Sequence, residues 1–179
     1  MNISMVFSTE QRVKILKHVI FETDTISVNE VSRETGTSKG LVSVYLNSLA
    51  EEGVLIKRGK TFRVAQSAGT KAARILLSLA SMDTRVFEGN PFVRSAGLYG
   101  SAVKGTNTRE SDVDVWILHD SASPEQLSKV TKALAVYGNV KPIYLTAEKV
   151  REMEREDPVF YYSLVFGSIT LYGEPIDAV

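Results

Sequence analysis

The stretch that decides the fold of this chain is GLYGSAVKGTNTRESDVDVWIL, residues Gly97 to Leu118. A short apolar strand, Phe92 to Tyr99, is predicted to end at the Gly-Ser pair, and a second strand is predicted from Asp112 to Leu118. Strand side chains alternate between the two faces of a sheet, so Asp112 and Asp114 share one face while the valines beside them point into the core. We therefore expect two carboxylates together at the start of a strand.

Two carboxylates in this arrangement suit a site for a nucleotide and Mg²⁺. They lie about 6 to 7 Å apart, twice the ~3.3 Å rise per residue, so their oxygens can converge on one or two cations. Two such metals can activate an attacking oxygen and stabilise a leaving pyrophosphate. At Gly100-Ser101, the glycine lets the backbone approach a triphosphate, and the amides at a helix start and the Ser101 hydroxyl can donate to its oxygens. The alternative, the polar face of an ordinary strand, needs no Gly-Ser turn ten residues earlier.

Four neighbours of these motifs are interpreted from their positions, and two of them, Lys104 and Trp116, have an alternative interpretation. Lys104 and Ser111 belong to the predicted nucleotide site, although an exposed lysine in a loop is more often simply solvated. Trp116 shares the aspartate face and is interpreted as a packing residue, with stacking on a base as the alternative. His119 follows the strand and is expected at the surface.

The first 66 residues predict three helices followed by a hairpin. Ser8 and Ser27 each begin a capping pattern, and the second helix is expected to end at Gly36. A third helix follows Ser38, and strands 54–58 and 61–64 flank a Gly-Lys turn. The order short helix, glycine turn, longer helix and hairpin resembles a winged helix-turn-helix domain.

The outer face of the third helix and the hairpin supplies the candidate DNA contacts. Hydroxyl and amide side chains can reach base edges, and basic side chains can hold backbone phosphates. The alternatives are a merely solvated face, or a module for protein docking or dimerisation. The candidates are Ser38, Lys39, Ser43, Asn47, Lys57, Arg58 and Lys60.

The composition excludes several classes of site. The 21 basic and 21 acidic side chains cancel, so any basic patch is local. Cysteine is absent, which excludes disulfides and cysteine nucleophiles. The sequence also lacks an apolar run of the ~20 residues that a membrane span requires, so a cytoplasmic protein is expected.

The chain divides into two expected domains. The stretch AQSAG, residues Ala65 to Gly69, is the predicted linker, with a boundary after Gln66. Domain one is 1–66 and domain two 67–179. A helix over Thr70 to Ser81 is expected to pack on the following sheet through Ala72, Ile75, Leu76 and Leu79.

A family resemblance rests on the motif residues Gly100, Ser101, Gly105, Ser111, Asp112 and Asp114. With them, residues from about 70 to 179 resemble the minimal nucleotidyltransferases of the DNA polymerase beta superfamily. The resemblance implies an α+β fold, with a palm-like mixed sheet and flanking helices joined to the winged helix-turn-helix domain. It also implies a nucleoside triphosphate such as ATP, and two Mg²⁺ held by the aspartates. The acceptor is not specified by the sequence; relatives can modify proteins, including partner toxins, so a protein is the first acceptor to test, and the winged helix suggests a homodimer.

The chain departs from this pattern at one position. Active members carry a third carboxylate on a later strand, but the corresponding stretch VKPIYL, Val140 to Leu145, contains no acid. Pro142 indicates an edge strand or a bulge, Lys141 could bind phosphate, and Glu148 is a weak substitute for the acid. Three functions therefore stay open: a nucleotidyltransferase that binds DNA, a nucleotide-sensing transcriptional regulator without turnover, and a protein-docking adaptor.

Overall fold

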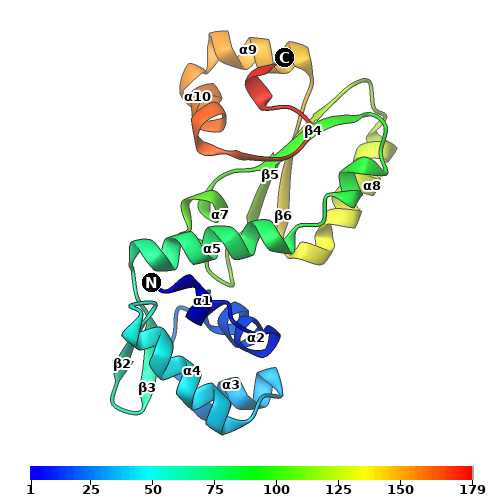
Figure 1. Ribbon diagram of the computed structural model, residues 1–179. Helices are drawn as coiled ribbons and strands as arrows, with labels where there is room; N and C mark the ends of the chain where they lie inside the picture. The colour runs from blue at the N-terminus through cyan, green and yellow to red at the C-terminus, as the bar shows by residue number, and fades with distance from the viewer. Residues whose placement is uncertain (179) are drawn as a thin grey trace. The chain divides into compact units, whose positions relative to one another are not determined.

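The computed structural model describes residues 1–178, which form two compact units (Figure 1). The first unit contains Met1–Leu77 together with the short segment Asn107–Glu110. The second contains Ser78–Thr106 and the chain from Ser111 onward. The boundary predicted after Gln66 lies in the loop before helix α5. Within the described residues, no helix is long and apolar enough to cross a membrane.

The first unit has the predicted winged helix-turn-helix order. Ser27 Oγ accepts a hydrogen bond from Glu30 N (3.2 Å) at the start of α3, and Gly36 ends this helix with a φ of 64°. The cap of α2 is Thr9 rather than the predicted Ser8, whose hydroxyl donates to Met5 O instead. The elements are α1 (Ile3–Val6), α2 (Glu10–Val19), β1 (Ile26–Ser27), α3 (Val28–Thr35), α4 (Lys39–Glu51), β2 (Leu55–Arg58), β3 (Thr61–Val64) and, as far as Leu77, α5 (Ala68–Ser81).

The predicted hairpin is one side of a three-stranded antiparallel sheet in the order β1-β3-β2. Leu55 pairs with Val64 and Arg58 with Thr61, so the turn falls at the predicted Gly-Lys pair. Strand β1 has only two residues, too short for a sequence pattern to reveal. In the core of this unit, Tyr45 of α4 is fully buried, its hydroxyl donates to Val6 O (2.5 Å), and burial raises its pKa.

Helix α5 buries a different face from the one predicted. Ala73 and Leu77 join the core of the first unit, whereas Ala72 is exposed and Leu76 is 49% exposed. Arg74 is also buried, because its Nε donates to Ile20 O (2.8 Å), and burial lowers its pKa. The prediction was wrong for Ala72 and Leu76, because the face with Arg74 and its carbonyl partner is buried instead. It was right for Leu79, which packs against the core around the following sheet.

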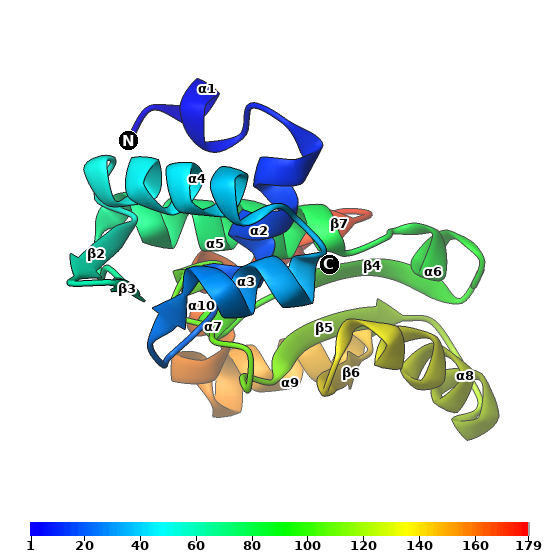
Figure 2. The same ribbon diagram turned by 90° about the horizontal axis from the view of Figure 1, so that it is seen from below.

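The second unit is built on a mixed sheet in the order β6-β5-β4-β7. Strands β5 and β6 are parallel, while β4 is antiparallel to both β5 and β7. Figure 2 shows β4 and β5 side by side and α8 next to β6. The elements are α6 (Arg85–Glu88), β4 (Val93–Leu98), α7 (Ser101–Lys104), β5 (Val113–His119), α8 (Pro124–Leu134), a 3₁₀ turn (Ala135–Tyr137), β6 (Val140–Leu145), α9 (Ala147–Glu156), α10 (Pro158–Gly167), β7 (Ile169–Tyr172) and a 3₁₀ turn (Ile176–Ala178).

The predicted alternation along β5 is confirmed, because its two faces belong to different cores. Val115 and Ile117 pack in the core that includes α8, and Trp116 packs in the core that includes α9 and α10. Trp116 is fully buried, which excludes the stacking alternative in this structure. His119 is only 9% exposed, against the prediction of a surface residue, because its ring packs edge-on to Tyr144 (6.0 Å between centroids).

Candidate functional site

The two aspartates lie where β5 begins. Asp112 precedes the strand and is exposed, whereas Asp114 is within it and half-buried. Burial, and secondly the charge of Asp112, raises the pKa of Asp114. The two carboxylates therefore repel each other at neutral pH, and a bound cation would relieve that repulsion.

Gly100 is required by Asp114 as well as by the turn. Its φ of 69° and ψ of −140° belong to a region that only glycine adopts readily. A Cβ at this position would overlap Asp114 Oδ2 and lie 3.0 Å from Asp114 Cγ. Tyr99 N donates to Asp114 O (3.1 Å), which holds the two strands in this register. The structure thus brings the Gly-Ser turn and the second aspartate into direct contact.

The turn leads into the predicted short helix, α7. Lys104 N donates to Gly100 O (3.3 Å) and Thr106 N to Ser101 O (3.1 Å), and Gly105 ends the helix with a φ of 65°. Ser101 at the start is half-buried, and Lys104 at the other end is exposed. Ser111, also half-buried, directly precedes Asp112.

Asn139 is a site residue that the sequence reasoning missed. Its Nδ2 donates to Asp112 Oδ1 (2.5 Å), and its carbonyl accepts from Val113 N (3.0 Å). Asn139 directly precedes β6, as Asp112 directly precedes β5, and parallel neighbours bring their starts together. A polar residue at the start of the strand after α8 was the available signal. The hydrogen bond from Asn139 fixes the orientation of the exposed Asp112 carboxylate.

Lys141 lies beside Asp114. The two residues are partners in the parallel register of β5 and β6, so their side chains share a face of the sheet. The next pair along that face, Trp116 and Ile143, packs in one core, which agrees with this assignment. A lysine therefore lies next to the aspartate on the strand expected to carry the third acid. Strand β6 is an edge strand, as Pro142 predicted.

Glu148 does not replace the missing acid. It follows Leu145, which pairs with Leu118 at the far end of β5 from the aspartates. Lys141 to Leu145 alone spans ~13 Å at ~3.3 Å per residue. Glu148 instead lines an open surface pocket with Arg151 and Arg155. Among residues 1–178, no three acidic or histidine side chains are grouped to hold a metal.

The candidate DNA-contact residues lie on α4 and on the β2–β3 hairpin. Asn47 is already engaged: its Nδ2 donates to Ser43 O (2.7 Å) and its Oδ1 accepts from Lys57 Nζ (2.7 Å). Lys57 Nζ also lies 5.9 Å from the Phe62 ring centre. Ser38 caps α4 by accepting from Leu41 N (3.4 Å). The remaining basic side chains, Lys39, Arg58 and Lys60, are exposed.

In comparisons with known protein families, one family model matches each of the two units. Residues 84–176 match the family described as Polymerase beta, Nucleotidyltransferase, and residues 9–56 match the family described as Winged helix-turn-helix DNA-binding. No curated protein matches the chain.

Similar solved structures include two toxin–antitoxin proteins and a transcriptional regulator. One toxin–antitoxin structure contains AMP-PNP; it is 23% identical over 52% of this chain and 72% of that chain, with a TM-score of 0.40. A mutant of the toxin–antitoxin MntA-HpeT is 19% identical over the same shares, with a TM-score of 0.38. An IclR family transcriptional regulator from Brucella abortus is 9% identical over 76% of this chain and 64% of that chain, with a TM-score of 0.35.

Proposed function

Because the chain belongs to the polymerase beta nucleotidyltransferase family and carries a DNA-binding winged helix-turn-helix, we propose that it is a Mg²⁺-dependent nucleotidyltransferase positioned on DNA. The observation that carries this proposal is the contact of the Gly100 turn with Asp114, next to Asp112. Both features of the family motif, the turn and the acid pair, are thereby present in one place.

The residues of this site fit Mg²⁺ and a triphosphate. Carboxylate oxygens are the ligands that Mg²⁺ prefers, and Asp112 and Asp114 would hold it. When bound, the metal supplies neutralisation of the charge that develops on the transferred phosphoryl group. Ser101 would donate to the triphosphate, with Lys104 and Ser111 as further phosphate contacts. Asn139 keeps the Asp112 carboxylate in one orientation through its hydrogen bond.

The overall reaction would move a nucleoside monophosphate from ATP or another triphosphate to an acceptor hydroxyl. The bond from the hydroxyl oxygen to the α-phosphorus forms, the hydroxyl proton passes to solvent, the bond from the α-phosphorus to the oxygen that bridges it to the β-phosphorus breaks, and pyrophosphate leaves. The acceptor proposed for first trial is a protein, a partner toxin included. We further propose that the protein works as a homodimer on two half-sites and that 1–66 and 67–179 are its functional domains.

Two measurements test the reaction. Isothermal titration of ATP with Mg²⁺ should show binding to the wild type and none to Asp112→Asn/Asp114→Asn. Incubation with labelled triphosphates and cell extract should then label an acceptor only when both aspartates are intact. Absence of metal-dependent binding in the wild type would refute the proposal.

The wing is tested separately. Simultaneous Lys57→Ala, Arg58→Ala and Lys60→Ala changes should weaken retention on heparin and on duplex DNA and should reduce the salt dependence of binding, because three phosphate contacts are removed. Unchanged retention would show that the hairpin does not hold phosphates. The same variant should keep its affinity for ATP.

The position of Lys141 favours a second candidate function, a sensor that binds a nucleotide without turnover. A lysine beside Asp114 can hold a phosphate but cannot serve as the third metal ligand. Under this hypothesis the wild type binds MgATP and transfers no label. Lys141→Asp would then gain transfer, whereas Lys141→Ala would not. Any aspartate-dependent transfer of label by the wild type would reject the sensor.

A further inference from the structure

The segment Asn107–Glu110 joins the two motifs of the nucleotide site but belongs to the winged-helix unit. The chain leaves the second unit after Thr106 and returns to it at Ser111, directly before Asp112. The start of the aspartate strand is therefore connected on its N-terminal side to a segment that packs with the first unit.

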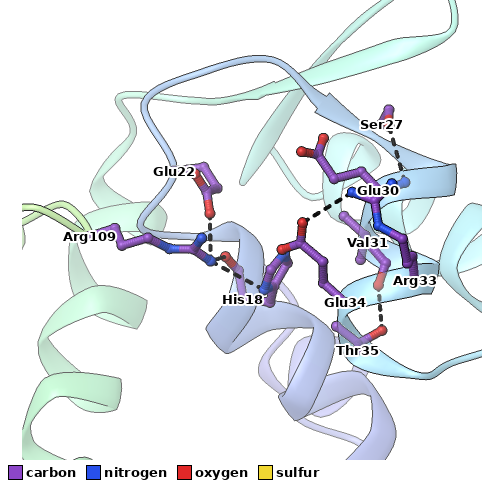
Figure 3. Close-up of polar contacts among 9 residues, drawn as sticks. All are labelled: His18, Glu22, Ser27, Glu30, Val31, Arg33, Glu34, Thr35 and Arg109. Carbon is purple, nitrogen blue, oxygen red and sulfur yellow. Dashed lines mark hydrogen bonds and ion pairs between the residues drawn. The ribbon is translucent and has the colours of Figure 1, made fainter.

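Arg109 holds this segment through its backbone amide and through its side chain, whose contacts with Glu22 and His18 are shown in Figure 3. Arg109 N donates to Phe21 O (3.0 Å), and Nη2 lies 2.7 Å from Glu22 Oε1. Nη2 also donates to His18 Nδ1 (3.2 Å) and lies 3.4 Å from His18 O. The guanidinium thus binds His18 at the end of α2 and Glu22, which follows α2.

The contact extends into helix α3. Because an arginine can only donate, His18 Nδ1 accepts, which leaves the Nε2–H to face Glu34 Oε2 at 3.2 Å. The side chains of Glu22 and His18 are only 23% and 18% exposed. The Arg109 side chain is 55% exposed, so the Arg109–Glu22 ion pair is shielded mainly on the Glu22 side and is only partly screened by solvent. Arg109, His18 and Glu34 therefore form one chain of contacts from the segment to α3 (Figure 3).

We propose that Arg109 is a positioning residue that couples nucleotide binding in the second unit to the arrangement of helices α2 and α3 in the winged-helix unit. The inference rests on the proposed nucleotide site. A free segment between the two motifs would have to be ordered when the nucleotide binds, and this ordering opposes binding. Because Glu22 and Phe21 already hold the segment, its conformational entropy is lost on folding and no longer opposes nucleotide binding. By reciprocity, nucleotide binding then stabilises the same arrangement of α2 and α3.

The test compares MgATP affinity in variants of the full chain by isothermal titration. Arg109→Ala and Glu22→Ala should each weaken binding on the order of five- to tenfold, the lower range of allosteric couplings, and Arg109→Ala at least as much as Glu22→Ala because it also removes the contact with His18. The double alanine variant should be no weaker than Arg109→Ala alone. The exchanged pair Glu22→Arg/Arg109→Glu should recover part of the affinity. Arg33→Ala is the matched control, because Arg33 pairs with Glu34 (3.4 Å) without contacting the segment, and it should change nothing.

Hydrogen exchange gives a second readout that needs no affinity measurement. MgATP should slow exchange of the Arg109 amide and of the α2 end in the wild type but not in Glu22→Ala. Loss of affinity in Arg109→Ala alone, with Glu22→Ala unaffected, would overturn the proposal and show that Arg109 touches the nucleotide directly. Unchanged affinity in both variants would overturn it as well. Absence of binding to the wild type would instead refute the nucleotide site itself.

Discussion

Replacement of Gly100 by alanine tests the contact on which the nucleotide site depends. The alanine would keep a φ near 69° and a ψ near −140°, which costs a non-glycine residue about 1 to 3 kcal/mol. Its Cβ would also overlap Asp114 Oδ2, and relief of such overpacking costs a further ~1 to 3 kcal/mol. We expect the second unit to lose about 2 to 6 kcal/mol of unfolding free energy, a large part of the 5 to 15 kcal/mol that is typical of a domain.

The assay uses the fluorescence of Trp116, the single tryptophan of the chain, during urea unfolding. Trp116 is fully buried in the second unit, so its signal follows that unit alone. Gly138→Ala is the matched control: Gly138 has a similar backbone (φ 112°, ψ −151°), but a Cβ there would meet no atom within 4 Å. It should lose the backbone part alone, about 1 to 3 kcal/mol.

The two variants also differ in a prediction about binding. In Gly100→Ala the carboxylate of Asp114 has to move away from its position, so Mg²⁺-dependent ATP binding should be lost even where the unit remains folded. Equal losses of unfolding free energy in the two variants would refute the reasoning, since the overlap with Asp114 would then have no cost. Retained ATP affinity in Gly100→Ala would refute it independently.

Three further predictions concern the same unit. Asn139→Ala frees the Asp112 carboxylate and should lower Mg²⁺-dependent ATP affinity about tenfold to a hundredfold in isothermal titration; unchanged affinity would remove Asn139 from the site. Leu164→Ala empties a fully buried position and should cost about 2 to 5 kcal/mol, whereas Val159→Ala on the same helix, 82% exposed, should cost less than about 0.5 kcal/mol. The pKa of Asp114 is higher in the folded chain than its ordinary value of 3.8, so between these two pKa values the folded state binds more protons than the unfolded state. The free energy of unfolding should therefore fall as the pH rises from the ordinary pKa through the raised one. Asp114→Asn should lack this fall, and identical pH profiles of the two proteins would contradict the assignment.

Local patterns were sufficient where a short stretch of chain sets its own structure. The cap of α3 by Ser27 and its end at Gly36 were predicted, because both depend on residues within one helix length. The alternation of β5 was predicted for the same reason, since it follows from the geometry of a single strand. The β2–β3 hairpin likewise depends on a turn within a few residues.

Non-local partners decided the features that were missed. Arg74 is buried in α5 because Ile20 O lies within reach, and no periodicity within α5 contains that carbonyl. His119 is buried by Tyr144, which lies on a neighbouring strand. Both of these errors concerned which distant segment covers a side chain, whereas the choice of Ser8 instead of Thr9 as the cap of α2 was a local error of one residue.

The sequence by itself determined that this protein has a winged helix-turn-helix followed by a nucleotidyltransferase motif, because that motif is a fixed spacing of glycine, serine and two aspartates. Only the tertiary structure decided which residues complete the site. The parallel register of β5 and β6 places Lys141 beside Asp114 and Asn139 against Asp112, and the packing of Arg109 assigns the intervening segment to the first unit. The physical reason is that strand register and ion pairing join residues far apart along the chain, and spacing within one stretch does not specify them.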